Sequence, residues 1–590
     1  MSQPFGGHDD NRWLLPQQAP FELRSLDLAL ARMVRQRTGS TALARLSAWL
    51  SAAERQGHAS LTVTPEQMTS ALDQHTRARD WVGDGAALTP LVWRDGQLSL
   101  WRNWRHEAVI AADLRLRAAA LVCPTSDSRA DLDALYPDSD SAEQRAAVSA
   151  ALGRGLFVLT GGPGTGKTST VLRLLLMLRL ALPEDADALQ IALAAPTGKA
   201  AARLAESVNS GKQALRESLT EARWRLAIDR VPEQAATLHR LLGYHPATDH
   251  FARNRKNPLA ADVVVVDEAS MVDLAMMRAL IEALRADATL ILVGDADQLV
   301  SVSAGSVLAD LVEAAGSTNS PLSHSVARLT RVWRTSGGLA EVYESLRQGD
   351  AGALSEALQQ PDQSRCRLRR CVDADQLHAR IHQWLADPHV LASLCPGADI
   401  EAPQALRLMG EHQLLCATRG GAFGAATVNT LIDAQLRARI GQGGLWYAGR
   451  RIIITRNDYG RRLFNGDVGI ALWADGALRV YFSASEERTG GCRSLLPQEL
   501  PEHDLAFAMT IHKSQGSEYR QVGVILPPDP GHPLLSRQLL YTAVSRAKLS
   551  AELWTSAEAL QAALQRVVRR QGGLLSRLGG EGGAQAEPAL

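Results

Sequence analysis

The stretch FVLTGGPGTGKTST, Phe157–Thr170, is the most informative part of the sequence. It matches G-x-x-x-x-G-K-[ST], with Gly161, Gly166, Lys167 and Thr168 at the fixed positions. In this motif backbone N–H groups at a helix N-terminus surround phosphates, the lysine reaches the terminal phosphates, and the hydroxyl ligates Mg²⁺. Apolar residues precede the loop and TSTVLRLLLMLRL follows it, which is the required strand–turn–helix context. The predicted phosphate-binding loop is Gly161, Gly162, Pro163, Gly164, Thr165, Gly166, Lys167 and Thr168.

The composition is that of an ordinary soluble protein. The chain has 590 residues, enough for about four domains. Its formal net charge is zero, so a site for a polyanion must be a local patch. Six scattered cysteines do not complete a four-ligand zinc site, and we interpret them as reduced thiols. No apolar run reaches membrane-spanning length and MSQPFGGHDD is not a signal peptide, so we expect a cytoplasmic protein without membrane contact.

Strand-like apolar runs alternate with helical stretches in the centre of the chain. The runs are LFVLT (156–160), IALAAP (191–196), DVVVVDEAS (262–270) and TLILVGD (289–295). This alternation predicts a parallel sheet with helices on both faces. A second set of runs begins near residue 406. Within it, the glycine-rich range 441–505 with turns at Asn465-Gly466 and Asp475-Gly476 predicts a small β-barrel or hairpin insert.

The two ends of the chain carry no catalytic motif. Leucine and alanine at helical spacing predict a helical domain over residues 1–118. Within it, LWRNWRHE (100–107) is either a packed helix or a docking surface for protein or DNA. The glycine-rich tail, 573–590, is predicted to be disordered. The two α/β domains between these ends are expected at 119–335 and 336–572.

Two further strand ends carry the residues that hydrolysis needs. The run VVVVDEAS presents Asp267, which can hold Mg²⁺ through water, and Glu268, which can orient the attacking water as a base. An Asp-Glu pair favours hydrolysis, because a nucleotide kinase needs an acceptor hydroxyl site and a lid instead. LVGDADQL places Gln298 where it can sense the γ-phosphate, and Asp295 or Asp297 where either can couple that signal to DNA contacts.

Several polar positions suit a nucleic-acid backbone. Thr197 and Lys199 follow the second strand and enter a helix, a placement typical of phosphate contacts. His239 is either a stacking or phosphate contact or a packed histidine. Far downstream, TIHKSQGSEY places His512 and Ser514 on one turn.

Two arginines far from Lys167 predict a site completed by two lobes. They are Arg334 in LTRVWRT and Arg546 in LLYTAVSRAK. Phosphoryl transfer gains from an arginine that reaches the γ-phosphate only when two lobes close. Such an arrangement lets the nucleotide state control lobe closure, which is how a motor works.

Taken together, these motifs resemble superfamily 1 helicases, and within them the RecD family, the alpha subunits of bacterial exodeoxyribonuclease V (RecBCD). The resemblance rests on EQRAAV, GGPGTGKT, APTGKAAARL, TLHRLLGY, VVVVDEASMVD, LVGDADQL, LTRVWR, NDYGRRLFNGD, TIHKSQGSEY and LLYTAVSRAK. It spans roughly residues 120–570 with the motifs in the family order, and LWRNWRHE resembles a stretch before the motor.

The resemblance implies two RecA-like motor domains and a 5′-to-3′ DNA helicase that uses ATP and Mg²⁺. It implies that Gln144 reads adenine, that Arg334 and Arg546 are arginine fingers, and that Gln298 is the γ-phosphate sensor. Asn465 and the β-barrel around it would line the DNA channel, and a small hairpin near 245–258 would be the strand-splitting pin. The partners would be RecB-like and RecC-like subunits, with the N-terminal domain as a partner-binding region.

Several alternatives to a DNA motor subunit are considered. No glutamate in the chain has a lysine two residues later, so the nuclease is expected on the partner beta subunit. An ATP-gated regulatory clamp that contacts DNA without separating strands remains the second hypothesis, although a clamp would not need the whole set of hydrolytic residues. An RNA or conjugative helicase of the same superfamily is the third. A relaxase would need an N-terminal tyrosine, and the first 115 residues have none.

Overall fold

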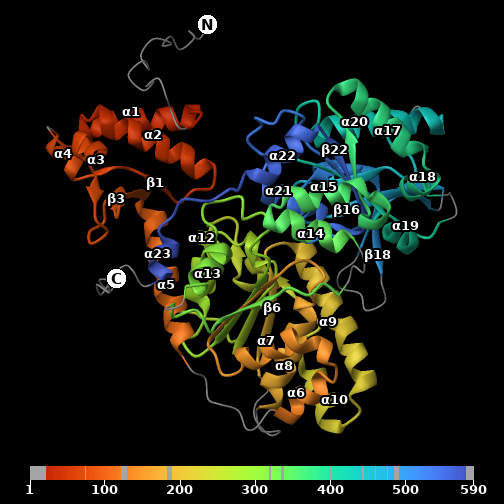
Figure 1. Ribbon diagram of the computed structural model, residues 1–590, viewed down its shortest axis with the longest axis horizontal. Coiled ribbons are helices and arrows are strands. Elements are labelled where there is room, and N and C mark those ends of the chain that lie inside the picture. The colour runs from red at the N-terminus through yellow and green to blue at the C-terminus, as the bar shows by residue number, and fades with distance from the viewer. Residues whose placement is uncertain are drawn as a thin grey trace.

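The computed structural model describes residues 21–73, 75–120, 129–181, 189–317, 320–333, 338–396, 400–441, 444–458, 460–474, 476–483 and 491–579. Within these ranges the chain forms an N-terminal region and two α/β lobes, with the N-terminal region and lobe 2 both lying above lobe 1 in the view of Figure 1. Among the helices of these ranges, none combines the length and the apolarity that crossing a membrane requires.

Lobe 1 is built on a six-stranded parallel sheet in the order β12-β5-β11-β10-β6-β7. Its strands are β5 (Leu156–Gly161), β6 (Ile191–Ala195), β7 (Ala236–Thr237), β10 (Val263–Val266), β11 (Thr289–Gly294) and β12 (Val326–Leu329). Its helices are α6 (Arg129–Leu135), α7 (Ala142–Ala151), α8 (Lys167–Leu180), α9 (Gly198–Ser218), α10 (Ala222–Arg230), α11 (Leu238–Leu241), α12 (Leu274–Ala283) and α13 (Val307–Ala315).

The two faces of this sheet explain its apolar sequence. Along β10, Val263 and Val265 join the core formed with α8, α9 and α10. Val264 and Val266 join the opposite core, formed with α12 and α13. Because helices cover both faces, every position of the strand is buried and no polar alternation is possible. Strand ends at one edge of the sheet then carry the polar residues.

Lobe 2 repeats the architecture with a five-stranded parallel sheet in the order β13-β22-β21-β14-β20. Its strands are β13 (Cys366–Arg370), β14 (His412–Cys416), β20 (Ala508–Thr510), β21 (Tyr519–Ile525) and β22 (Ala547–Thr555). Its helices are α14 (Leu339–Gln348), α15 (Ala351–Gln359), α16 (Pro361–Ser364), α17 (Ala374–Ala386), α18 (Pro388–Leu394), α19 (Ala402–Leu408), α20 (Ala425–Ile440), α21 (Arg537–Val544) and α22 (Ala557–Gln565).

Inserted into lobe 2 is an antiparallel sheet in the order β18-β17-β16-β15-β19. Its strands are β15 (Arg451–Ile454), β16 (Val468–Ala474), β17 (Ala477–Ser483), β18 (Cys492–Leu495) and β19 (His503–Leu505). It lies within the range 441–505 that the sequence marked as β-rich. In the described ranges β18 and β19 are end strands without a pairing between them, so closure into a barrel stays a prediction.

The N-terminal region differs from the helical domain that we predicted. Besides α1 (Ser25–Thr38), α2 (Thr41–Arg55), α3 (Pro65–Leu72), α4 (Thr76–Arg79) and α5 (Trp101–Ala119), it contains a four-stranded sheet in the order β1-β4-β3-β2. The strands are β1 (Ser60–Thr62), β2 (Val82–Gly83), β3 (Leu91–Arg94) and β4 (Gln97–Leu100). None is longer than four residues, too short for a clear periodicity in the sequence.

The start of the predicted disordered tail is instead ordered. Residues Leu574–Gly579 form α23, whose Leu574 and Leu578 are fully buried against α5 and α13. The chain therefore leaves lobe 2 after α22 and returns to lobe 1 and the N-terminal region (Figure 1). The prediction for 580–590 lies outside the described residues.

Candidate active site

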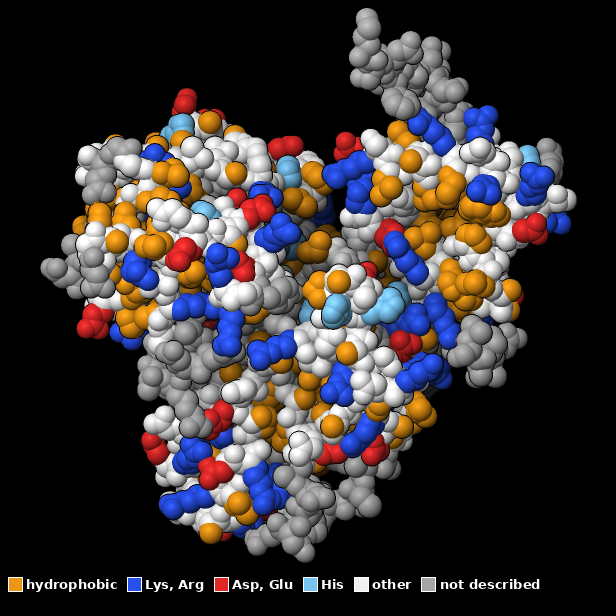
Figure 2. Space-filling view, turned by 180° about the vertical axis from the view of Figure 1, so that it is seen from behind, with side chains coloured by type: hydrophobic (Ala, Val, Ile, Leu, Met, Phe, Trp, Pro, Cys, Tyr) orange, Lys and Arg blue, Asp and Glu red, His pale blue; other side chains and the backbone are white. Residues whose placement is uncertain are grey.

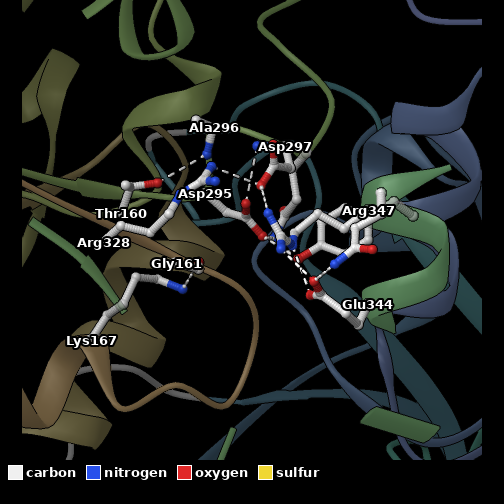
Figure 3. A network of polar contacts seen from close by, with 12 residues as sticks. Thr160, Gly161, Lys167, Asp295, Ala296, Asp297, Arg328, Glu344 and Arg347 are labelled. Carbon is white, nitrogen blue, oxygen red and sulfur yellow. Dashed lines mark hydrogen bonds and ion pairs between the residues drawn. The ribbon is translucent and has the colours of Figure 1, made fainter. Parts of the chain in front are cut away.

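The glycine-rich loop joins the end of β5 to the start of α8 in lobe 1. Gly164 and Gly166 have φ of 76° and 86°, a left-handed conformation that favours glycine. The ammonium of Lys167 donates to the carbonyl oxygens of Gly161 at 2.7 Å and Gly162 at 2.9 Å (Figure 3). The N-terminus of α8 and this lysine together direct positive charge toward the space that the glycine-rich loop surrounds.

Two neighbouring residues of α7 contact the glycine-rich loop and the segment after β12. Gln144 is buried, and its Nε2 donates to the carbonyl oxygen of Thr165 at 3.2 Å. Beside it the Glu143 carboxylate accepts the backbone N–H groups of Thr330 at 2.9 Å and Arg331 at 3.2 Å, just after β12. Glu143 ties α7 to the segment that leads to lobe 2, a role that the sequence reasoning did not assign to it.

The Asp-Glu pair lies where β10 ends, two strands away from β5 in the sheet. Asp267 Oδ1 accepts the backbone N–H of Glu268 at 2.9 Å, and Glu268 adopts a left-handed φ of 51°. Burial, together with the neighbouring Glu268 carboxylate, raises the pKa of Asp267, while Lys167 and Arg203 oppose that rise. Strain at a non-glycine residue of this kind is frequent at functional sites.

Gln298 connects the two lobes. Its Nε2 donates to Asp295 Oδ2 at 3.0 Å, and its Oε1 accepts the Arg546 guanidinium at 2.8 Å. The same Asp295 oxygen accepts the Tyr541 hydroxyl at 2.9 Å. All four side chains are buried. The predicted sensor and one predicted finger are thus in direct contact across the lobe interface, and Tyr541, which our sequence reasoning passed over, completes the network.

A second, outer network surrounds Asp297 (Figure 3). Its carboxylate pairs with Arg328 of lobe 1 at 3.0 Å and lies 3.9 Å from Arg347 of lobe 2. Arg347 is also paired with Glu344 of the same helix, α14. Burial and the nearby Asp295 raise the pKa of Asp297, and both arginines oppose that rise. No motif pointed to Arg328 or Arg347.

The residues predicted to contact nucleic acid have different exposures. Thr197 caps α9, its hydroxyl accepting the N–H of Ala200 at 3.2 Å, and together with Lys199 it is half-exposed. His239 is exposed in α11, the short helix that precedes a hairpin formed by β8 (Tyr244–His245) and β9 (His250–Phe251). Its ring lies 5.2 Å from that of Tyr244, so it is a surface aromatic group and not a core histidine.

Two further predicted contacts are accessible and one is not. Asn465 is exposed in a turn of the antiparallel insert, and His512 is half-exposed. Ser514 is fully buried, and its hydroxyl donates to the carbonyl oxygen of Ile511 at 2.7 Å. The short helical turn His512–Ser514 directs the Ser514 hydroxyl inward in this arrangement, and its contact with DNA stays a prediction. Arg334 lies outside the described residues.

Comparisons of the sequence with known proteins identify the family to which the chain belongs. Residues 21–94 match the family described as RecBCD enzyme subunit RecD, N-terminal domain. RecBCD enzyme subunit RecD of Mycobacterium tuberculosis is 41% identical over 498 residues, 82% of this chain and 81% of that protein. The chain belongs to the RecD family. RecD of Haemophilus influenzae is 32% identical over 536 residues, 82% of this chain and 81% of that protein.

Two further family models match within the lobes of this RecD-family chain. Residues 144–304 match a family described as AAA domain, and 505–553 match the UvrD-like helicase C-terminal domain. The first range runs from Gln144 to just past Gln298, and the second includes His512 and Arg546. The ATP-dependent RecD2 DNA helicase of Deinococcus radiodurans is 31% identical over 486 residues, 79% of this chain and 57% of that protein.

Proposed function

We propose that this RecD-family chain is an ATP-driven motor that moves 5′ to 3′ along single-stranded DNA. The observation that carries the proposal is the contact of Arg546 of lobe 2 with Gln298 of lobe 1, at 2.8 Å, beside the phosphate-binding loop. Because this arginine belongs to the other lobe, hydrolysis depends on the relative orientation of the two lobes. A change in phosphate charge then acts on residues of both lobes.

The residues around the phosphate-binding loop fit a nucleoside triphosphate with Mg²⁺. Thr168 and Asp267 supply the hydroxyl and carboxylate oxygens that Mg²⁺ prefers, where the ion would neutralise phosphate charge. Lys167 would contact the terminal phosphates, and Glu268 would orient the attacking water. Gln144, which contacts the loop from α7, would read the adenine. Arg334 would be a second arginine finger.

The polymer would lie across both lobes. Thr197, Lys199 and His239 of lobe 1 would contact it, and so would His512 of lobe 2 and Asn465 of the insert. Seen from behind, Lys and Arg side chains gather where the two lobes meet, with His side chains near the centre of that face (Figure 2). Such a local patch suits a polyanion although the net charge is zero.

Within the cell, we propose that the chain works in the cytoplasm as one subunit of a RecBCD-type complex. RecB-like and RecC-like subunits would be its partners, the nuclease would reside on the RecB-like subunit, and the complex would open duplex ends for repair. The N-terminal region, residues 21–94, supports this assembly because it matches the RecD-specific family. The alternative of a regulatory clamp is less favoured, since Lys167, Asp267, Glu268, Gln298 and Arg546 form a complete hydrolytic set.

The deciding experiment measures ATP hydrolysis by the purified chain with and without single-stranded DNA, beside Lys167→Gln. Strand separation is followed on duplexes with 5′ or 3′ overhangs. Hydrolysis that DNA stimulates and Lys167→Gln abolishes, with opening of the 5′-overhang duplex alone, supports the motor. Stimulated hydrolysis without opening, even after partner subunits are added, supports the clamp. Hydrolysis that DNA does not stimulate in either setting contradicts both.

A further inference from the structure

The first turns of α9 pack against a segment of lobe 2. Lys199 Nζ lies 5.8 Å from the centre of the Tyr519 ring. A Cβ added to Gly516 would lie 3.2 Å from the Cβ of Ala200. Arg203 forms an ion pair with Glu518. Lys199 and Arg203 are four residues apart on one helix and therefore share the face that touches lobe 2.

Arg203 also faces the acids at the end of β10. Burial of its guanidinium alone would lower its pKa, but the attraction of Glu518, Glu268 and Asp267 raises it instead. Arg203 therefore contacts the Glu518 carboxylate, and the charges of Glu268 and Asp267 also act on it. Two of these three carboxylates belong to the proposed hydrolytic centre of lobe 1, and the third belongs to lobe 2. Its side chain is 31% exposed and that of Glu518 is 9% exposed, so the pair is only partly screened by water.

Each partner of the pair lies a few residues after a proposed DNA contact in the chain. Lys199 precedes Arg203 by one helical turn in α9, and the turn His512–Ser514 shortly precedes Glu518. A strand bound across Lys199 and His512 would set the distance between α9 and the Glu518 segment. Arg203 spans that distance through its ion pair with Glu518, and its charge interacts with that of Glu268, so the same movement changes the electrostatic field at the proposed general base.

A purely structural role explains less. The lobes are already joined by the buried contacts of Tyr541 with Asp295 and of Arg546 with Gln298. Glu518 has a second cation, Lys548, at 3.7 Å, so loss of Arg203 does not leave it without a counter-charge. The pair of Arg203 with Glu518 is mostly buried, so its loss can also lower stability, and the melting curve of each variant measures that effect. What distinguishes Arg203 from the other contacts is its place between the two proposed sites.

We propose that Arg203 is a positioning residue that couples DNA binding to ATP hydrolysis by joining the Glu518 segment of lobe 2 to the β10 acids of lobe 1. The inference rests on the proposed function, because it needs hydrolysis that DNA stimulates. The inference assigns the coupling to the Arg203–Glu518 ion pair. This pair is separate from the phosphate-binding loop, from the two predicted arginine fingers and from the Gln298 sensor.

The test compares Arg203→Ala and Arg203→Lys with Arg216→Ala in the full-length chain. Arg216 is the matched control because it lies on the same helix and forms an exposed ion pair with Asp229 at 2.6 Å. Steady-state hydrolysis is measured with and without single-stranded DNA, and the affinity for labelled single-stranded DNA is measured at the same salt concentration. A melting curve of each variant excludes unfolding.

We expect Arg203→Ala to lower the DNA-stimulated kcat about tenfold or more, while the KM for ATP and the DNA affinity stay within roughly threefold. Arg203→Lys should recover part of the stimulation, because lysine keeps the charge but loses the planar fork. Arg216→Ala should behave like the wild type. A purely structural role would not separate kcat from KM and DNA affinity in this way.

Three results would overturn the inference. Arg203→Ala with normal stimulation would show that the pair does not couple the sites. A loss of DNA affinity as large as the loss of kcat would make Arg203 a DNA contact instead. Equal losses in Arg203→Ala and Arg216→Ala would assign the effect to the helix as a whole. If DNA does not stimulate hydrolysis by the wild type, the proposed function itself is contradicted. That outcome is distinct from a failure of the inference on Arg203, because it is seen without any variant.

Discussion

At the scale of single residues, Gly166 decides whether the phosphate-binding loop can form. Its φ is 86°, and a Cβ added there would lie 2.2 Å from the Nε2 of the buried Gln144. Any side chain therefore meets both backbone strain and a clash. We expect Gly166→Ala to cost about 1–3 kcal/mol of stability and to weaken ATP binding. Calorimetric melting and nucleotide titration measure the two effects.

Gly420→Ala is the control for that substitution. Gly420 has no left-handed φ, and a Cβ there would meet nothing within 4 Å. We expect its melting temperature and ATP affinity to match those of the wild type. If Gly166→Ala melts and binds as Gly420→Ala does, the loop does not depend on the left-handed conformation.

Arg546 tests the contact between the lobes. It is buried and donates to Gln298 Oε1, so its removal leaves a buried acceptor unpaired as well as removing the proposed finger. We expect Arg546→Ala to lower the kcat for ATP hydrolysis about 10³-fold or more, the magnitude that other arginine fingers contribute. Single-turnover hydrolysis measures the chemical step. A kcat within about tenfold of the wild type would remove Arg546 from the hydrolytic set.

Residue roles were predictable from sequence only where a short motif fixes them. The run VVVVDEAS indicated a buried strand ending in two acids, and the structure has Val263–Val266 followed by Asp267 and Glu268. Tyr541 was passed over because its role depends on Asp295, which is 246 residues away in the chain. The burial of Ser514, which we predicted as a DNA contact, was not foreseen, since the sequence does not reveal which side of a short turn faces the core.

At the scale of elements, Glu107 anchors α23 to α5. Its carboxylate is buried and accepts the backbone N–H of Gly573 with both oxygens, at 2.9 and 3.0 Å. Burial raises its pKa from 4.5 to about 7, although Arg577 and the Gly573 N–H favour the charged form. Between these two pKa values the folded state binds more protons than the unfolded state. Stability therefore falls as the pH rises from about 4.5 through 7.

We expect this junction to be up to about 3 kcal/mol less stable at pH 8 than at pH 5 because of Glu107. Glu107→Gln should remove that part of the dependence. Asp310, whose pKa is also raised, to about 6, is present in both proteins and interacts with Glu107, so their difference reports Glu107 together with that interaction. Hydrogen exchange of Leu574–Gly579 against pH measures the effect. Equal slopes for the wild type and Glu107→Gln would contradict the assignment.

Elements were predictable where they are long and periodic. Strands such as β5 and β11 and helices such as α8 in the lobes have this property, whereas β1 has three residues and β2 and β7 have two. The helix α23 escaped prediction for a different reason. Its two buried leucines, Leu574 and Leu578, are a single helical pair inside a glycine-rich stretch, and they are buried by α5 and α13, which lie far away in the sequence.

At the scale of the whole molecule, two layers of polar contacts with different environments cross the lobe interface around Asp295 and Asp297. The inner layer is the hydrogen bond of Tyr541 with Asp295, between side chains that are 2% and 1% exposed. The outer layer is the pair of Arg347 with Asp297, whose side chains are 27% and 32% exposed and 3.9 Å apart. Asp297 also has Arg328 at 3.0 Å within lobe 1, so loss of Arg347 leaves it paired. The inner layer should therefore dominate the coupling between the lobes.

Double-mutant cycles separate the two layers. We expect Tyr541→Phe with Asp295→Asn to give a coupling energy of about 1.5–3 kcal/mol, because the bond to a charged group is buried. Arg347→Gln with Asp297→Asn should give about 1 kcal/mol or less, because the pair is partly exposed and loosely placed. The DNA-stimulated kcat/KM for ATP provides the free energies. Raising the salt concentration should weaken the outer coupling and leave the inner one nearly unchanged, since only exposed charges are strongly screened. An outer coupling that equals or exceeds the inner one would mean that the lobes communicate through their surface charges and not through the buried contact beside the phosphate-binding loop.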